Sequence, residues 1–356
     1  MTKKIKQLIA SSEQVLRDCS LENGGIVAAN ITKSYYSRSS SNYFYVWPRD
    51  ASYICAAADI LEMDIQEPFF DWLTDRPEDF KKEDLLFQLY AANGRLAGKQ
   101  FQPDQMGSAL WAIHHHFKND LSKVYKYETL IRRLADGLCD DWKETHFFHN
   151  SSDLWEHSER RTSSKMENNF TYSLAACVRG LKFAHIMLNN KRWRETADEM
   201  TNRIEAAYDK EKKYFLRNHG KISDYNIDAS LLGLVYPFNI VKADDEKMIN
   251  TVKKIEKYLA SGGGVHRFQF DYYDGEGTAQ EGAGAWPLLN FWMSIYWSIY
   301  GDKEKALKYY DWVIGKIGDD NLIPEQIFDD FRKGIKPLAW SHAMFVIASK
   351  YLGYIK

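Results

Sequence analysis

The sequence predicts an all-α fold, a closed toroid of helix pairs with small hairpins in its loops. Segments with helical spacing of apolar residues recur along the whole chain, strand signals are few and short, and no stretch repeats at a fixed period. The missing repeat argues against an α-solenoid, the other architecture open to a chain of many helices. With 356 residues and a hydrophobic content of 45%, the chain is long enough to bury a large core, so we expect residues 1–356 to form a single domain.

Twelve segments have the apolar spacing of amphipathic or buried helices. The first places Ile5, Leu8 and Val15 on one face, with charged residues opposite. The second follows Pro48, a residue suited to the first turn of a helix, and is rich in Ala, Ile and Cys, which indicates burial on most sides. The predicted helices are 3–18, 51–61, 66–75, 105–118, 122–142, 167–188, 190–209, 226–236, 243–259, 281–300, 302–318 and 338–353.

Strand signals occur at three places: LLFQLY near residue 85, KYFLRN near 213 and VHRFQF at 265. Each is short and lies between predicted helices. Each is therefore predicted to form part of a small hairpin in a connecting loop.

Charge and hydropathy exclude several classes of partner. A net charge of −2 leaves no basic excess with which to neutralise phosphates, so no nucleic acid is expected. No run approaches the ~18 apolar residues of a membrane span. The first residues are charged throughout and contain no apolar core of a signal peptide, so we expect a cytoplasmic protein. The sequence leaves the oligomeric state open.

No metal or cofactor is expected. Cys19, Cys55, Cys139 and Cys177 are far apart and show no C-x-x-C spacing, which favours buried free thiols over zinc ligands or disulfides. The three consecutive histidines at 114–116 point in different directions on a helix, so they lack the i, i+4 spacing of a helical metal site. DYYDGEG also lacks the spacing of a calcium loop.

The segments between the helices carry the candidate chemistry. They are rich in Trp, Arg, Asp, Glu and Gly, and polar loops on a rigid scaffold are where binding and catalysis usually occur. Eleven Trp and twenty-two Tyr suit the stacking of sugar rings, although they also suit an ordinary core. A toroid would bring these loops together at one rim. They are NYFYVWPRDAS, FQPDQMGS, SSDLWEHSE, SDYNIDAS, SGGGVHRFQFDYYDGEGTAQEGAGAW and LIPEQIFDD.

Five of these blocks, in order, resemble the catalytic domain of the glucoamylase family, glycoside hydrolase family 15, over nearly the whole chain. The blocks are NYFYVWPRDAS, QPDQMGSALWA, DLWE, GGGVHRFQFDYYDG, and PEQ followed by PLAWSHA. The resemblance implies an (α/α)6 barrel of six inner and six outer helices. It also implies exo-acting hydrolysis of an α-glucoside with inversion, which releases β-glucose.

The resemblance assigns Glu156 as the general acid and Glu325 as the general base. An inverting glycosidase needs an acid for the leaving oxygen and a base about 6.5–9.5 Å away that activates a water on the opposite face of the sugar. Desolvation against Trp155 favours the protonated form of Glu156, whereas hydrogen-bond donors would keep Glu325 ionised. Gln326 and His342 are plausible neighbours of Glu325 by sequence.

The remaining site residues are expected to bind the sugar or line its pocket. Arg49 and Asp50 would hold hydroxyls of the nonreducing-end sugar, and Arg267 would be a second sugar-binding arginine. For Asp104, a loop-bracing role is equally open. The full set of expected substrate-binding residues is Tyr43, Trp47, Arg49, Asp50, Asp104, Trp155, His157, Arg267, Asp271 and Trp286.

Two departures from the family pattern affect the expected substrate. His157 stands where glucoamylases often have a second acid, so contacts to the leaving sugar differ. We also expect neither an N-terminal β-sandwich nor a starch-binding module, which favours small oligosaccharides over starch granules. The leading expectation is hydrolysis of α-1,4-linked glucose from maltooligosaccharides or dextrins.

Four other functions stay open. Within the family they are hydrolysis of α,α-trehalose and of isomaltose or dextran ends. Outside it they are a non-catalytic carbohydrate-binding protein, which would need neither Glu156 nor Glu325, and a sugar epimerase, which would want paired histidines that the blocks do not supply.

Overall fold

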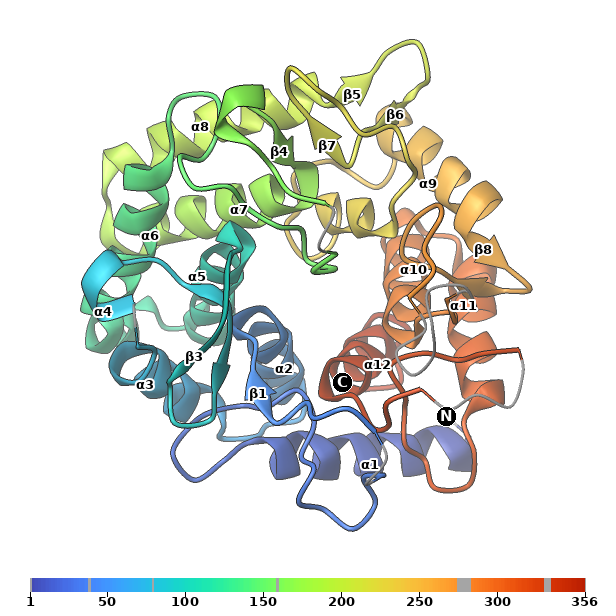
Figure 1. Cartoon of the computed structure of the whole chain (residues 1–356). Helices are drawn as coiled ribbons and strands as arrows, with labels where there is room; N and C mark the ends of the chain where they lie inside the picture. The colour runs from blue at the N-terminus through green and yellow to red at the C-terminus, as the bar shows by residue number, and fades with distance from the viewer. Residues whose placement is uncertain are drawn as a thin grey trace.

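The helices form two concentric layers, an inner ring around the middle of the molecule and an outer ring around it (Figure 1). The computed structural model describes residues 2–37, 40–78, 80–157, 160–273, 283–329 and 334–355. The α-helices are α1 (Lys3–Cys19), α2 (Pro48–Ile60), α3 (Gln66–Asp75), α4 (Phe80–Glu83), α5 (Pro103–Phe117), α6 (Glu128–Asp141), α7 (Thr171–Leu188), α8 (Lys191–Ala206), α9 (Glu246–Leu259), α10 (Pro287–Tyr300), α11 (Lys303–Lys316) and α12 (Ala339–Tyr351). The 3-10 helices are η1 (Leu121–Tyr127), η2 (Ser164–Met166) and η3 (Ala229–Leu234).

The inner ring is closed. Among the described elements, α2 packs against α5, α5 against α7, α7 against η3, η3 against α10, α10 against α12, and α12 back against α2. The outer ring contains α1, α3, α6, α8, α9 and α11, each packed on an inner element (Figure 1). The predicted closed toroid of paired helices, the (α/α)6 barrel, is therefore confirmed.

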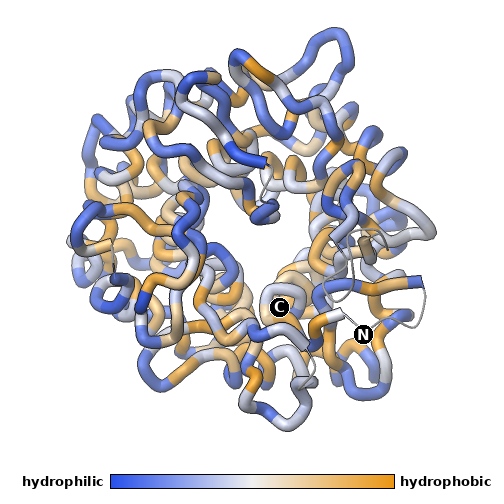
Figure 2. The backbone as a smooth tube through the Cα atoms, viewed as in Figure 1, coloured by the Kyte–Doolittle hydropathy of each residue, from blue (hydrophilic) through white to orange (hydrophobic). Residues whose placement is uncertain are grey.

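Residue composition separates the two rings. Inner helices are apolar on most sides, and every residue of α12 from Ala339 to Ser349 is buried. Outer helices have one apolar stripe, such as Met248, Val252 and Ile255 on α9. A helix that is apolar all round must be buried on all sides, whereas an amphipathic helix covers a core with one face. Figure 2 accordingly shows hydrophobic residues along the helices and hydrophilic residues along the outer loops.

The predicted helix boundaries differ from the structure at three main places. The segment predicted as helix 226–236 is the short 3-10 helix η3, because Asp228 caps Ser230 and Pro237 cannot donate an intrahelical hydrogen bond. The segment 122–142 divides into η1 and α6. The predicted start of helix 281–300 falls on residues 274–282, which lie outside the described residues, and α10 begins at Pro287. The short helix α4 was not predicted.

A hairpin forms at each of the three predicted places, although only Val265 of the segment VHRFQF lies in a strand. The antiparallel strands β2 (Phe87–Ala91) and β3 (Leu96–Phe101) pair with each other, and β1 (Tyr45–Val46) adds to the edge of β2. The two-stranded sheets are β4 (Asn169–Phe170) with β7 (Asn218–His219), β5 (Tyr208–Asp209) with β6 (Tyr214–Phe215), and β8 (Ala260–Ser261) with β9 (Gly264–Val265). The β2–β3, β5–β6 and β8–β9 hairpins lie in connections between helices, whereas β4 and β7 pair with each other across α7 and α8 in the sequence.

The inner helices share one direction, so the barrel has two different ends. Residues at the N-terminal ends of α2, α10 and α12 line one cavity, and residues at the C-terminal ends of the same helices line another. We call these the front and rear ends. Proline occupies the first turn of α2, α5 and α10, where its missing N–H costs no intrahelical hydrogen bond. None of the described helices combines the length and apolarity that crossing a membrane requires.

Candidate active site

The front cavity has a volume of about 670 Å³ and gathers residues from segments far apart in the chain. Ten of the twelve predicted site residues line it, and Asp104 and Asp271 do not. The ten are Tyr43, Trp47, Arg49, Asp50, Trp155, Glu156, His157, Arg267, Trp286 and Glu325. The fold therefore brings the two predicted catalytic carboxylates to one cavity, although they are 169 positions apart in the sequence.

Glu156 is held by four hydrogen-bond donors. Trp47 Nε1 donates to its Oε1 at 2.8 Å, and Arg49 Nη2 and Gln102 Nε2 donate to the same atom at 3.4 Å. Gln88 Nε2 donates to the other oxygen, Oε2, at 2.6 Å. The backbone of Glu156 has a positive φ of 62°, a conformation that costs free energy for a residue other than glycine. The surrounding contacts thus fix this side chain in one orientation.

Burial raises the pKa of Glu156, and this effect exceeds the lowering by Arg49 and the amide and indole donors. The side chain is 22% exposed, so its route to solvent is through the cavity. A carboxyl group with a raised pKa retains its proton closer to neutral pH, as a general acid must.

Glu325 has a different environment. Tyr43 Oη donates to its Oε1 at 3.0 Å, and the hydroxyls of Tyr43 and Tyr273 are 3.2 Å apart. Because Tyr43 has one hydroxyl proton, which it donates to Glu325, the proton between the two tyrosines comes from Tyr273. Oε2 of Glu325 is buried and has no hydrogen-bond partner among the described residues. One oxygen is therefore oriented by the tyrosine pair, and the other has no partner in the part of the chain that the structure describes.

The pKa of Glu325 is raised to about 7, mainly by burial. Tyr43 and Arg267 lower this pKa, whereas the carboxylates of Asp50 and Glu156 raise it. Near neutral pH a substantial fraction of Glu325 is ionised. That fraction can accept a proton.

The loop that carries Glu325 is fixed by its backbone. Glu325 N donates to Ile335 O at 2.8 Å, and Ile323 N donates to Nε2 of the buried His342 at 2.9 Å. Nδ1 of His342 is 2.9 Å from Ser12 Oγ. Burial lowers the pKa of His342 to about 3, which keeps its imidazole neutral and able to accept from Ile323. His342 thus braces the loop backbone, and none of its hydrogen bonds is to Glu325.

Arg49 and Asp50 lie in the first turn of α2. Arg49 Nη1 donates to Asp104 Oδ2 at 2.9 Å, and Arg49 Nε lies 3.6 Å from Asp50 Oδ1. The pKa of Asp50 is raised to about 7, mainly by burial. Arg49 lowers this pKa, whereas the carboxylates of Glu156 and Asp104 raise it. Asp104 is fully buried beneath Arg49, a position that fits the bracing role considered from the sequence.

Arg267 is oriented by a fork of two hydrogen bonds. Its Nε and Nη2 donate to the two carboxylate oxygens of Asp271, each at 2.8 Å. The guanidinium lies over the rings of Trp286 and Tyr273, at 4.8 and 4.9 Å from their centroids. Since both oxygens of Asp271 accept from Arg267, Asp271 orients the arginine that lines the cavity.

His157 lines the cavity beside the general-acid candidate. Its ring meets Phe268 edge-on at 5.9 Å, and its Nδ1 is buried without a hydrogen-bond partner among the described residues. A sugar hydroxyl in the cavity is a suitable partner for such a nitrogen.

Several site residues were not predicted individually. Gln88, Tyr272, Tyr273 and Trp340 line the cavity, and Gln102 lies beneath it and donates to Glu156. Tyr272 and Tyr273 belong to the block GGGVHRFQFDYYDG, and Trp340 belongs to PLAWSHA. Gln88 lies on β2, in a segment identified only as a strand, and nothing in that pattern marked it.

The cavity is suited to acid–base chemistry. Two carboxyl groups with raised pKa values, two arginines and several aromatic rings can bind a polyhydroxylated ring and exchange protons with it. Among the described residues, no group of three or more His, Cys, Asp or Glu side chains is arranged to hold a metal ion.

Comparisons with known proteins point to one family. Residues 87–310 match the model of the glycosyl hydrolases family 15. The chain is 30% identical to an uncharacterized glycosyl hydrolase of Methanocaldococcus jannaschii over 92% of its length and 52% of the relative's. It is 26% identical to an isomaltose glucohydrolase of Kribbella flavida, over 72% of this chain and 65% of the relative, and 25% identical to trehalase 2 of Sulfolobus acidocaldarius, over 92% and 60%. The chain thus spans about half to two thirds of the length of these curated relatives.

Solved structures share the fold. A wild-type glycosidase superposes with a TM-score of 0.81 at 22% identity, covering 99% of this chain and 98% of that one. A glycosidase variant in complex with glucose gives a TM-score of 0.80 at 21% identity, with the same coverage. A bacterial glucoamylase complexed with acarbose gives 0.74 at 19% identity, covering 97% of this chain and 55% of that one.

Proposed function

Because the chain belongs to the glycosyl hydrolases family 15, we propose that it is an inverting, exo-acting α-glucosidase that uses Glu156 as general acid and Glu325 as general base. One observation carries the proposal. Glu156 and Glu325 line the same cavity in different environments. Four nitrogen donors hold Glu156, whereas a tyrosine hydroxyl holds one oxygen of Glu325 and the other has no partner within the described part of the chain. Two carboxyl groups with distinct surroundings suit distinct acid and base roles.

The proposed reaction begins with the nonreducing-end glucose in the front cavity. Arg49, Asp50 and Arg267 bind its hydroxyls, and Trp47 and Tyr43 form its walls. Each arginine is already fixed by a buried carboxylate, so little side-chain entropy is lost on binding.

Hydrolysis then needs one proton given and one proton taken. Glu156 donates its proton to the glycosidic oxygen as the bond between this oxygen and C1 breaks. A water bound at Oε2 of Glu325 gives a proton to that carboxylate while its oxygen attacks C1 from the opposite face. The products are β-glucose and a saccharide that is one glucose shorter and carries a new free hydroxyl. Glu325 then loses its proton and Glu156 regains one through solvent.

We take α-1,4-linked glucose at the end of maltooligosaccharides or dextrins as the first substrate. The specific reason is the match of five ordered blocks to glucoamylases. A binding protein without turnover would need neither Glu156 nor Glu325, so their arrangement counts against that alternative.

The second candidate is α,α-trehalose, with isomaltose as a third. Curated relatives that the chain resembles are named trehalase and isomaltose glucohydrolase. His157 beside the acid supports a leaving-group site unlike that of glucoamylases. All three substrates would use the same acid and base.

A substrate panel tests the proposal. Purified protein is incubated separately with maltotriose, isomaltose and trehalose, and glucose is measured with time, giving kcat/KM for each. The proposal predicts release from at least one substrate, with maltotriose highest. If kcat/KM is higher for trehalose than for maltotriose, trehalose becomes the preferred substrate. Absence of glucose release from all three substrates would contradict the proposed hydrolase activity.

A further inference from the structure

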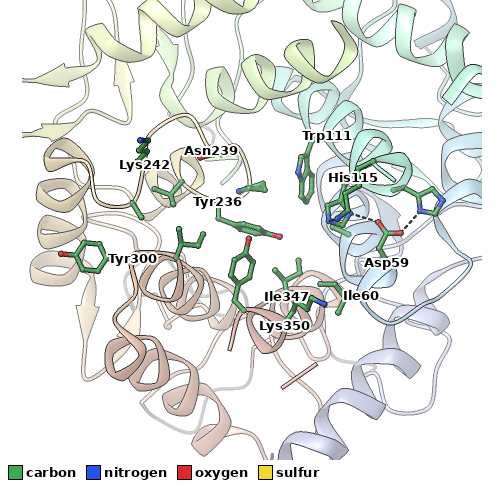
Figure 3. Close-up of a pocket in the computed structure, with 18 of the residues that line it drawn as sticks. Asp59, Ile60, Trp111, His115, Tyr236, Asn239, Lys242, Tyr300, Ile347 and Lys350 are labelled. Carbon is green, nitrogen blue, oxygen red and sulfur yellow. Dashed lines mark hydrogen bonds and ion pairs between the residues drawn. The ribbon is translucent and has the colours of Figure 1, made fainter. Parts of the chain in front are cut away.

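A second cavity, of about 1220 Å³, opens at the rear end of the barrel. It is lined by the C-terminal ends of α2, α5, α10 and α12 and by the segment that follows η3. Figure 3 shows Tyr236 near the middle of this lining, with Asp59 and His115 on one side and Lys242 and Asn239 on the other. The proposed hydrolysis makes no use of these residues.

Buried aromatic rings separate the rear cavity from the active site. Trp340 lines the front cavity and Trp111 lines the rear cavity. The fully buried ring of Tyr53 lies between them, 5.2 Å from Trp340 and 5.3 Å from Trp111 between centroids. The rear cavity is therefore a separate compartment.

Aromatic rings give this cavity flat apolar surfaces. The rings of Tyr236 and Tyr351 meet edge to face at 5.4 Å, and Tyr351 is 43% exposed. Tyr300, at the end of α10, is exposed as well. Rings that combine an accessible face with a polar edge suit the C–H faces and hydroxyls of sugars.

Polar groups next to these rings are oriented or unpaired. Asp59 accepts hydrogen bonds from Nδ1 of His115 at 2.7 Å and of His116 at 2.6 Å, and these bonds fix both imidazoles. Among the described residues, the Nζ atoms of Lys242 and Lys350 have neither a hydrogen-bond nor an ion-pair partner. The cavity thus offers fixed acceptors and free donors, which a hydroxyl-rich ligand can satisfy.

The charge of the lining favours a neutral ligand. The lining contains three carboxylates (Asp59, Glu62 and Asp244) and three ammonium groups (Lys118, Lys242 and Lys350). The C-terminal ends of four helices meet here, and their partial negative charge opposes the binding of an anion. With the lysines offsetting the carboxylates, no excess positive charge remains to hold a phosphate.

We propose that the rear cavity is a second, non-catalytic binding site for a neutral saccharide. The sugar stacks on Tyr236 and Tyr351 and forms hydrogen bonds with Lys350, Lys242 and the Asp59 cluster. This site goes beyond the proposed hydrolysis and does not depend on it, because it requires binding and no turnover.

The experiment is a binding titration of the full chain carrying Glu156→Gln, which prevents loss of the probe by hydrolysis. Maltose, isomaltose and trehalose are titrated by calorimetry. We expect two equivalents of at least one sugar per chain. Adding Trp47→Ala weakens the front event alone. Adding Tyr351→Ala, at an exposed position where folding is tolerant, weakens the rear event about three- to tenfold. Tyr258→Ala, at an equally exposed tyrosine on α9, is the matched control and leaves both events unchanged.

Three results would overturn the site. One is a single equivalent that Trp47→Ala weakens and Tyr351→Ala does not. A second is the absence of sugar binding at millimolar concentration. A third is competition by inorganic phosphate for the event that Tyr351→Ala weakens, which would contradict the charge argument. Two equivalents in a chain whose parent hydrolyses none of the sugars would uphold this site and refute the proposed function alone.

Discussion

The two ends of helix α2 carry aspartates in opposite electrostatic situations. At the front, burial raises the pKa of Asp50 to about 7, and neighbouring carboxylates add to the effect. At the rear, burial also raises the pKa of Asp59, but hydrogen bonds from His115 and His116 outweigh it and lower the pKa to about 2. At the front end, the carboxyl groups of Asp50 and Glu325 have pKa values near 7, so both can gain or lose a proton near neutral pH. At the rear end, Asp59 is paired with two imidazoles and stays ionised. Protonation chemistry is therefore expected at the front alone, and binding at both ends.

The largest effect should come from removing either front carboxylate. Glu156→Gln and Glu325→Gln each keep the shape of the side chain but remove its proton exchange, so kcat should fall about 10²–10⁴-fold. Glu62→Gln makes the same change in the rear lining and should leave kcat unaltered. Initial rates of glucose release measure all three. Near-parental activity in either front variant would show that its assigned role is wrong.

The tyrosine pair beside Glu325 should give the next largest effect. Tyr43→Phe removes the hydrogen bond to Oε1, and a bond to a charged acceptor is worth about 1.5–3 kcal/mol, so kcat should fall about 10–100-fold. Without this donor the pKa of Glu325 rises further, which shifts the acidic limb of the pH–rate profile upward. Tyr273→Phe leaves the bond to Glu325 in place and should cause a smaller change in the same direction. An unshifted acidic limb in Tyr43→Phe would argue that this limb does not report Glu325.

Stability should depend on pH in opposite ways at the two ends. Folding raises the pKa of Glu325 from its ordinary 4.5 to about 7. The contribution of Glu325 to the free energy of unfolding is therefore fully present below pH 4.5 and is lost as pH rises through 7. The difference in unfolding free energy between Glu325→Gln and the parent should therefore shift in favour of the variant from pH 4 to pH 8, by up to about 3 kcal/mol. Urea unfolding at the two pH values measures the change.

Asp59 provides the reverse case. Its pKa is lowered from 3.8 to about 2, so its contribution is present above pH 3.8 and is lost as pH falls through 2. Asp59→Asn should destabilise the protein at pH 7 by about 2 kcal/mol, with a smaller penalty at pH 3. The same direction of change in Glu325→Gln and Asp59→Asn would remove the contrast between the two ends.

The smallest effect is expected at His157. His157→Asn keeps a polar side chain at the cavity wall but removes the imidazole that can contact the leaving sugar, so KM should rise about two- to tenfold with little change in kcat. Initial rates over a range of substrate concentrations measure the change, and an unchanged KM would exclude His157 from substrate binding.

The fold could be predicted because its signals are local. Helical spacing of apolar residues depends on neighbours three and four positions away, so eleven of the twelve predicted helices have α-helical counterparts. The prediction of a long helix at 226–236 was wrong because Pro237 limits this segment to the short 3-10 helix η3. Propensity alone could not show that a 3-10 turn completes the inner ring.

The site could be predicted only in part, because its contacts are not local. The ordered blocks predicted Glu156 and Glu325 at one site, and the fold brings both to one cavity. Gln88, however, binds Glu156 across 68 positions and Tyr273 meets Tyr43 across 230. No spacing rule connects such pairs. The rear cavity has no sequence signature for the same reason, since the ends of four inner helices form it only after the ring closes.

The most direct test of the acid–base pair is proton NMR of the first glucose released from the best substrate of the panel. An inverting enzyme places water on the face opposite the leaving group, so we expect the β anomer to appear first and mutarotation to produce α-glucose later. The α anomer appearing first would mean retention, and would contradict the assignment of Glu325 as a base acting through water.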